Sequence, residues 1–260
     1  MVPHRSLRSA VLIFLAGITQ RIGFDRSAGK FLFTDRVVYP KNLHEIERNI
    51  SLTEPIGILP AKIPLPEINS TAEELETVSN WLNSINLAKN RPFVCFAPGS
   101  IWPTKRWPED HWRVLAKKFN GMGIPIILIG AQQDQNLAPG IMNSSGNGIF
   151  NAMGIFSIRQ SAELIRQASL LISNDSAPTH LGVAVETLVI TIFGSTVPTF
   201  GFYPYGKKNK IIEITELDCR PCTDHGRVKC PLGHFKCMRD ILPSQVFQTA
   251  RDMIDAEFKS

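Results

Sequence analysis

The sequence predicts an α/β fold of the doubly wound type, on three observations. From Glu73 onward, stretches with strand character alternate with amphipathic helical stretches. The expected strands at 170–172 and 188–193 are continuous apolar runs, as is typical of parallel strands buried on both faces. Glycines, hydroxyl residues and acids follow the strands, where α/β proteins hold their ligands.

Composition narrows the class of protein without naming a function. The chain has 260 residues, is 43% hydrophobic and contains no low-complexity tract, so it is globular and long enough for two modest domains. Its formal charge of +5 suits a polyanion, a membrane surface or a phosphorylated small molecule equally well.

The first 72 residues have a less regular pattern. Arg5 and Arg8 precede the apolar run 10–16 in the manner of a signal peptide. That run is too short to span a bilayer, which takes about 20 residues, so a packed helix over 6–16 is the better interpretation. We expect an extended segment over 31–39 and a helix over 44–52. Four prolines between residues 54 and 69 predict a linker there.

The elements after residue 73 are predicted from local patterns. Trp112, Leu115, Ala116 and Phe119 share one face of a helix over 108–119, and Pro108 suits its first position. Capping-box residues at 157 and 160 open a helix that runs to 168. The other elements expected are a helix from 73 to about 87, strands over 93–97 and 124–129, a short strand near 149, a helix opened by residue 178, and a helix over 243–258.

Four segments that follow strands are candidates for one ligand crevice, and they comprise residues 98–100, 130–134, 174–176 and 194–196. Glycine lets a phosphate approach the backbone, hydroxyls donate to its oxygens, and acids accept from sugar hydroxyls. Neither a Walker A motif nor GxGxxG is present, which argues against a P-loop NTPase and a dinucleotide oxidoreductase. A nucleotide-sugar fits these residue types better.

Three motifs carry a family resemblance: PGSIWPTKRWPEDHW, LIGAQQD and SNDSAPTHLGVAVETLVITIFGST, in this order. They resemble the C-terminal half of the ADP-heptose lipopolysaccharide heptosyltransferases, glycosyltransferase family 9. Upstream, HRSLRSAVLIFLAGITQRIGFDRSAG resembles an internal stretch of that family's N-terminal domain. The resemblance implies a GT-B fold of two Rossmann-like domains and an inverting transfer of a sugar from an ADP-sugar without a catalytic metal or cofactor.

The resemblance also implies domain limits and partners. We expect a partial N-terminal domain with its linker over 1–72, a nucleotide-sugar-binding domain over 73–242, and a helix over 243–260 that crosses back to the first domain. The implied partners are an ADP-sugar donor and a lipopolysaccharide core or lipid A acceptor, with peripheral contact to the inner membrane and no nucleic acid. The implied location is cytoplasmic, with the cytoplasmic face of the inner membrane as a more specific place within it.

Carried over by motif, the resemblance assigns roles to individual residues. Lys105 would contact the donor diphosphate and stabilise the leaving group, and Asp175 would hold the sugar; these two are the expected catalytic residues. The remaining expected binding residues are Ser100 and Thr104 on the Lys105 loop, Asp134 at the ribose, Ser176 and the backbone of Ala177 at the phosphate, and His180 in a supporting role.

Structural alternatives stand beside these assignments. Lys105 would otherwise belong to a solvated loop, and Asp175 would cap the helix that follows it. Asp134 would be an exposed turn acid, and His180 a packing residue on the apolar side of its helix.

The N-terminal region departs from the family pattern. The opening strand, its glycine-rich turn and the acidic base expected upstream of MVPHRSLRSA are absent, which predicts an incomplete N-terminal domain. A truncated protein that binds a nucleotide-sugar without transferring it is therefore the alternative function.

A cysteine cluster supplies a further hypothesis. Cys219, Cys222, Cys230 and Cys237, with two histidines between them, suggest a structural zinc site, or more weakly a zinc module for nucleic acid. The second pair of cysteines misses the zinc-ribbon spacing, so we expect reduced packing thiols and no bound metal.

Overall fold

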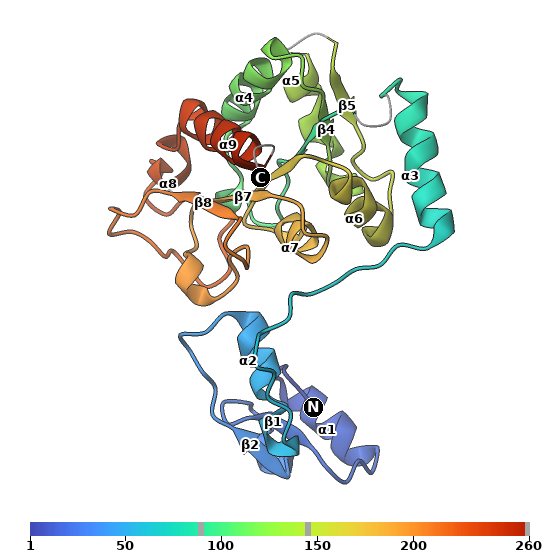
Figure 1. The fold of residues 1–260 in the computed structure, drawn as a ribbon. Helices are drawn as coiled ribbons and strands as arrows, with labels where there is room; N and C mark the ends of the chain where they lie inside the picture. Colours follow the sequence, from blue (N-terminus) through green and yellow to red (C-terminus); the bar gives the residue numbers. More distant parts are fainter. Residues whose placement is uncertain (88–90, 144–146, 258–260) are drawn as a thin grey trace. The chain divides into compact units, whose positions relative to one another are not determined.

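The computed structural model describes residues 1–87, 91–143 and 147–257, and the chain divides into two compact units (Figure 1). The first comprises Met1–Pro66 with Thr199–Phe202, and the second comprises Glu67–Pro198 with Tyr203–Ser260. The segment expected as a linker starts with a 3-10 turn at Glu54–Ile56 and holds no other helix or strand up to residue 69.

The first unit contains α1 (Leu7–Leu15), β1 (Ile22–Phe24), β2 (Asp35–Val37) and α2 (Glu45–Ser51). The helices expected over 6–16 and 44–52 are confirmed. The extended segment over 31–39 is wrong in its first part, because Lys30–Leu32 forms a 3-10 turn. The strand β2 pairs in parallel with β1, which the sequence pattern did not predict.

Two small apolar clusters hold this unit together. One joins the β-strands to residue Leu52 after α2, and the other joins Val2, Ala10 and Phe33. Ala10 is the buried residue of α1, whereas Leu12 and Leu15 on the same helix are exposed. Within the part of the chain that the structure describes, no helix is long and apolar enough to cross a membrane.

The second unit is built on a six-stranded parallel sheet in the order β5-β4-β3-β6-β7-β8. The strands are β3 (Val94–Ala97), β4 (Ile126–Leu128), β5 (Ile149–Asn151), β6 (Leu170–Asn174), β7 (Val189–Phe193) and β8 (Lys210–Glu213). The helices are α3 (Ala72–Ser84), α4 (Glu109–Gly121), α5 (Ala138–Met142), α6 (Ile158–Arg166), α7 (Ala177–Ala184), α8 (Lys236–Arg239) and α9 (Pro243–Glu257). This confirms the doubly wound α/β prediction.

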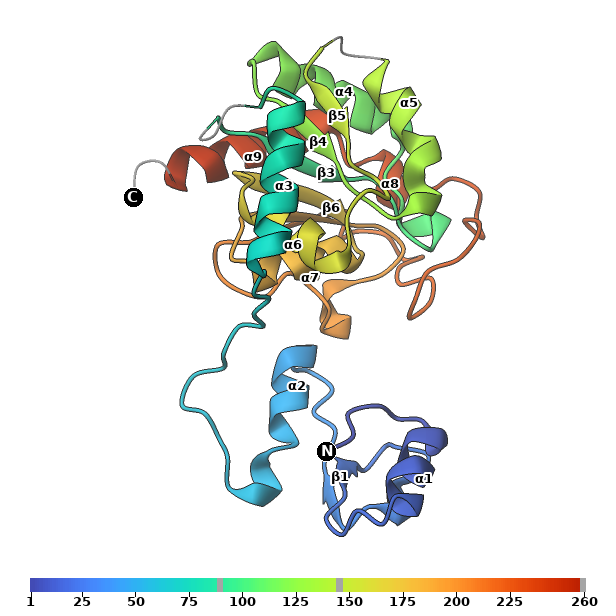
Figure 2. The same cartoon turned by 90° about the vertical axis from the view of Figure 1, so that its right-hand side faces the viewer.

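Alternate residues of each strand supply two cores, because successive side chains of a strand point to opposite faces of the sheet. Val94 and Phe96 face a cluster with α4, α5, α8 and α9. Cys95 and Ala97 face a second cluster with α3, α6 and α7 (Figure 2). Both faces of the sheet are covered, which explains the continuous apolar runs in the central strands.

The helix α9 packs within the second unit. Val246, Ala250 and Met253 are buried in the same cluster as α4. The Phe247 ring meets the Phe119 ring edge-on with 5.2 Å between their centroids, an arrangement that aromatic pairs favour. The predicted helix end at Phe258 lies outside the described residues. Its crossing to the first domain stays a prediction.

Candidate active site

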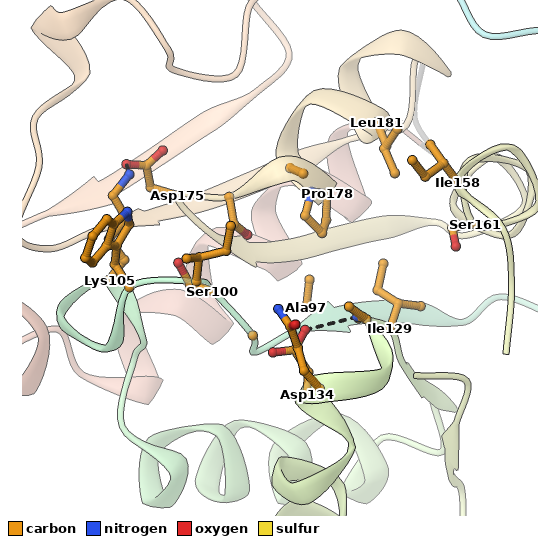
Figure 3. Close-up of a pocket in the computed structure, with 18 of the residues that line it drawn as sticks. Ala97, Ser100, Lys105, Ile129, Asp134, Ile158, Ser161, Asp175, Pro178 and Leu181 are labelled. Carbon is orange, nitrogen blue, oxygen red and sulfur yellow. Dashed lines mark hydrogen bonds and ion pairs between the residues drawn. The ribbon is translucent and has the colours of Figure 1, made fainter. Parts of the chain in front are cut away.

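A pocket of about 490 Å³ opens at the carboxyl ends of β3, β4 and β6 (Figure 3). The chain builds the sheet outward from β3 to β5 and then returns to add β6 on the other side of β3. Such a reversal separates the loops after β3 and β6 and leaves a crevice between them, which is where doubly wound proteins bind ligands. Its volume lies within the range of about 300–1,000 Å³ that small-molecule sites occupy.

The pocket has a polar end and an apolar end. Figure 3 shows Lys105, Asp175 and Ser100 together on one side, and Ile158 and Leu181 on the other. Residues from three of the four segments expected to form one crevice line it, together with the start of α6. The fourth segment, 194–196, does not line the pocket; it reaches the site only through Thr196, which hydrogen-bonds to Asp175. The lining residues with polar side chains are Ser100, Trp102, Lys105, Gln133, Asp134, Ser161, Asp175 and Ser176, and the apolar ones include Ile129, Phe156, Ile158 and Leu181.

Lys105 and Asp175 form an ion pair at the polar end. The Lys105 Nζ lies 2.6 Å from Asp175 Oδ2, and the Thr196 hydroxyl donates to the same oxygen at 2.6 Å. The two charged side chains are only 14% and 9% exposed. Both partners use Oδ2, so Oδ1 of Asp175 keeps accepting capacity for a ligand hydroxyl.

The helix α7 begins beside this pair. Its N-cap residue is Ser176, which makes no side-chain capping bond. The predicted capping role of Asp175 is therefore wrong, because its carboxylate is turned toward Lys105 instead. The backbone N–H of Ala177, in the first turn, has no partner within a helix and adds to the positive end of the helix dipole. Ser176 and Ala177 line the pocket as predicted from sequence.

Asp134 is buried rather than an exposed turn acid, with 7% of its surface accessible. Its Oδ2 accepts from the Ala131 N–H at 3.0 Å, which closes the first turn of the 3-10 helix Gln132–Leu137. Its Oδ1 is buried and has no hydrogen-bond partner among the described residues. A side chain at Gly99 would lie 2.4 Å from the Asp134 carboxyl carbon, so glycine there lets the acid fit. A buried acceptor without a donor is the arrangement that a ligand hydroxyl satisfies.

Two predicted site residues lie elsewhere. Thr104 is buried behind the Lys105 loop and does not line the pocket. Its hydroxyl donates to the Arg227 carbonyl at 2.9 Å and accepts from the Arg227 N–H at 2.7 Å. A hydroxyl has one hydrogen to give, so this one has none for a phosphate.

His180 is exposed on α7 and lies outside the pocket lining. Its predicted position on the apolar side of the helix is wrong, because Thr179 and Val183 face the core instead. Ser100, by contrast, is buried in the pocket wall as expected.

Asn174 is a residue that sequence reasoning named only as part of a strand end. It is fully buried. Its amide nitrogen donates to the Pro98 carbonyl at 2.8 Å, and its amide oxygen accepts from the Trp107 N–H at 3.0 Å. One side chain therefore ties the loop after β6 to both ends of the loop that carries Lys105. The available signal was a polar residue at the end of a strand that starts with three apolar residues.

The cysteine cluster lies apart from the pocket lining. The Cys219 Sγ is 4.0 Å from His234 Nε2, and Cys237 is buried in the core beside Met238. Burial raises the pKa of the Cys237 thiol to about 12 and also raises that of Cys222, with neighbouring cysteines acting in the same direction. Among residues 1–87, 91–143 and 147–257, no three metal-ligating side chains converge.

Comparison with known proteins identifies the motif set. The sequence pattern of glycosyltransferase family 9 (heptosyltransferase) matches residues 2–232. Lipooligosaccharide heptosyltransferase 2 of Haemophilus influenzae is 24% identical over 268 residues, which cover 98% of this chain and 75% of that protein. Lipopolysaccharide heptosyltransferase 2 of Escherichia coli is 26% identical over 259 residues, which cover 94% of this chain and 71% of that protein.

Solved structures share the fold. The structure described as E. coli ADP-heptose lps heptosyltransferase II superposes with a TM-score of 0.79 at 24% identity, covering 98% of this chain and 76% of that one. An E. coli heptosyltransferase solved with ADP gives a TM-score of 0.65 at 18% identity, covering 97% and 73%. These likenesses support the architecture derived above from the sheet order and its two helical layers.

Proposed function

The chain belongs to glycosyltransferase family 9, and from this premise we propose that it transfers a heptose, or a related sugar, from an ADP-sugar to a lipopolysaccharide core acceptor. The family match and the heptosyltransferase relatives make the protein a glycosyltransferase. We propose, beyond this, the identity of the donor, a transfer without a catalytic metal and a role for each site residue.

One observation carries it: the pocket joins a polar end, which holds Lys105, to an apolar end across a single crevice. A nucleoside diphosphate sugar has the matching parts, a dianionic diphosphate and a flat base. Lys105 and the N-terminus of α7 suit the diphosphate. The apolar surface of Phe156, Ile158 and Leu181 suits the base. A relative's structure was solved with ADP and another with ADP-2-deoxy-2-fluoro heptose, ligands of this class.

The residues between these ends suit the two sugars. The unpartnered Oδ1 of Asp134 accepts a hydrogen bond from a ribose hydroxyl. This bond removes the cost of about 1–3 kcal/mol that a buried unsatisfied acceptor carries. The Oδ1 of Asp175 accepts a hydroxyl of the transferred sugar. Ser100 lines the same pocket from the loop after β3.

In the transfer step, the oxygen of an acceptor hydroxyl bonds to the anomeric carbon and its proton passes to a general base or to water. The bond from that carbon to the diphosphate oxygen breaks, and ADP leaves. Negative charge builds on the departing ADP. Lys105 and the Ala177 N–H are fixed donors at that position, and such preorganised donors lower the barrier. Because an ammonium group supplies the positive charge, we propose that the transfer needs no divalent cation and that a chelator leaves the rate unchanged. The acceptor, a lipid-linked saccharide, would bring the protein to the cytoplasmic face of the inner membrane.

Isothermal titration calorimetry with ADP and with ADP-heptose tests the donor site. We expect both to bind the wild-type protein, and Lys105→Met to weaken ADP binding at least tenfold because the cation beside the diphosphate is lost. Transfer of heptose to a lipid A–Kdo acceptor in the presence of a chelator tests the reaction. Absence of ADP binding by folded wild-type protein would refute the donor site, whereas binding without transfer would support the truncated binder instead.

A further inference from the structure

Lys105 stands on a short turn whose position is set by a loop distant in sequence. The turn is the 3-10 helix Pro103–Lys105, and its side away from the pocket packs on the segment Thr223–Arg227. This segment lies inside the cysteine-rich stretch that the proposed function leaves without a role.

The first contact runs through Thr104. Its backbone N–H donates to the Arg227 carbonyl at 3.1 Å, and its hydroxyl exchanges two hydrogen bonds with the Arg227 backbone, at 2.9 and 2.7 Å. The Ser195 hydroxyl lies 3.1 Å from the same Thr104 oxygen. Because the Thr104 hydrogen is given to the Arg227 carbonyl, Ser195 is the donor in that contact. Thr104 is thereby held from two sides, immediately before Lys105.

The second contact runs through Gly226. Its φ of +108° is unfavourable for residues with a side chain, and a Cβ there would lie 2.8 Å from the Trp102 Cβ and 3.4 Å from the Lys105 Cγ. The backbone of Gly226 therefore packs closely against the aliphatic part of the Lys105 side chain. The Thr223 hydroxyl fixes the position of this backbone, since it accepts from the Gly226 N–H at 2.7 Å and donates to the Gly226 carbonyl at 2.9 Å.

The loop is in turn attached to the sheet. The Cys222 N–H donates to the Ser195 carbonyl at 2.9 Å, and the next residue, Thr196, donates to Asp175. Residues 195 and 196, which lie just after β7, thus hold the loop that positions Lys105 and the carboxylate that pairs with it. The short segment after β7 therefore holds both partners of the ion pair in place.

We propose that the segment Thr223–Arg227 is a positioning element for Lys105, with Thr104 and Gly226 as the positioning residues that fix the ammonium group at the diphosphate. This rests on the proposed function. Neither residue lines the pocket, so each acts through Lys105. Misplacing a catalytic group by about 1 Å can lower a reaction rate about 100-fold. A loosened turn would also move the ammonium group away from the diphosphate and so weaken binding.

A double-mutant cycle with ADP as the ligand tests the proposal, because residues that act through one another are not additive. Thr104→Val keeps the size of the side chain and removes the hydroxyl. We expect it to weaken ADP binding about tenfold, the effect of about one hydrogen bond to a charged group. Thr104→Ser keeps the hydroxyl and stays within about twofold of the wild type by the same reasoning. In the Lys105→Met background, Thr104→Val should change ADP affinity very little.

A matched control comes from the same loop. Gly226→Ala should weaken binding, whereas Gly233→Ala should not: Gly233 also has a positive φ of +72°, but its added Cβ would meet nothing within 4 Å.

The outcomes separate this inference from the proposed function. If wild-type protein binds no ADP, or Lys105→Met binds it as well as wild type, the proposed function fails and the positioning role with it. If Lys105→Met weakens binding and Thr104→Val does not, the positioning role alone is refuted. It is refuted equally if Thr104→Val weakens ADP binding by the same factor with and without Lys105, since the effect would then not pass through the lysine.

Discussion

Replacing Asn174 with alanine should destabilise the second unit strongly and weaken ADP binding as well. The side chain is fully buried and joins two backbone groups, the Pro98 carbonyl and the Trp107 N–H. Asn174→Ala leaves both without partners in a place that water does not reach. Each unsatisfied group costs about 1–3 kcal/mol, so the loss is about 4 kcal/mol in all. For a unit of this size, that corresponds to a fall in Tm of about 8–16 °C.

Asn209 offers a matched control elsewhere in the same unit. Its amide oxygen accepts from the Val189 N–H at 3.0 Å and its amide nitrogen donates to the Tyr205 carbonyl at 2.8 Å, the same pair of bonds that Asn174 makes. Asn209 is half-buried and lies outside the pocket lining. Water can replace its amide, so we expect Asn209→Ala to cost about 2 kcal/mol or less and to leave ADP affinity unchanged.

Urea unfolding followed by fluorescence gives the two free energies of unfolding, and calorimetry with ADP gives the two affinities. The reasoning predicts a larger loss of stability for Asn174→Ala, together with weaker ADP binding, because the loop of Lys105 is no longer tied to β6. An Asn174→Ala protein as stable as Asn209→Ala, or one that binds ADP like the wild type, would refute it.

Three further predictions follow from local geometry and titration. Gly99→Ala should displace the Asp134 carboxylate, whose carbon lies 2.4 Å from the position of the added Cβ, and so weaken ADP binding in calorimetry. Gly121→Ala is the control, because its added Cβ meets nothing within 4 Å. Equal ADP affinities of the two variants would contradict this prediction. At pH 8, Cys237 and Cys95 should react with a thiol reagent more slowly than Cys219 and Cys230. Burial raises the pKa of Cys237 to about 12 and also raises that of Cys95, and the thiolate is the reactive form. Peptide mass spectrometry that finds Cys237 labelled first would overturn this prediction. Glu74 has its pKa lowered by the Thr71 backbone N–H, with Arg159 acting in the same direction, so its stabilising effect is present above its ordinary pKa of 4.5 and is lost as the pH falls through the lower folded value. Glu74→Ala should therefore lower Tm at pH 7 but not at pH 3, and a pH-independent decrease would show that the charge is not responsible.

The parts of the fold that could be predicted are those that local patterns specify. The face formed by Trp112, Leu115, Ala116 and Phe119 is buried along α4 as its spacing indicated. The edge strand β8 was not predicted, because Lys210–Glu213 has mixed exposure and becomes a strand only by pairing with β7. The partners of such a strand are distant in sequence and leave no local signal.

The same division applies to the site. Lys105, Asp175 and Asp134 could be proposed because a motif places them after strands. The role of Thr104 could not be predicted, since its partner Arg227 lies 123 residues away. His180 was assigned to the wrong side because α7 has eight residues with apolar groups on most of its faces, so sequence periodicity does not determine which face packs on the sheet.

The polar residues at the strand ends fall into two groups with different tasks. The side chains of Asn174 and Thr104 form hydrogen bonds with backbone groups of neighbouring loops. Asp134, Asp175 and Ser176 line the pocket, and the two acids each keep an oxygen that no described hydrogen bond uses. The first group fixes where the second group stands before any ligand arrives. Donors and acceptors held in this way cost no reorganisation when charge develops on a leaving group. Loss of a residue from the first group should therefore impair binding even though that residue never meets the ligand.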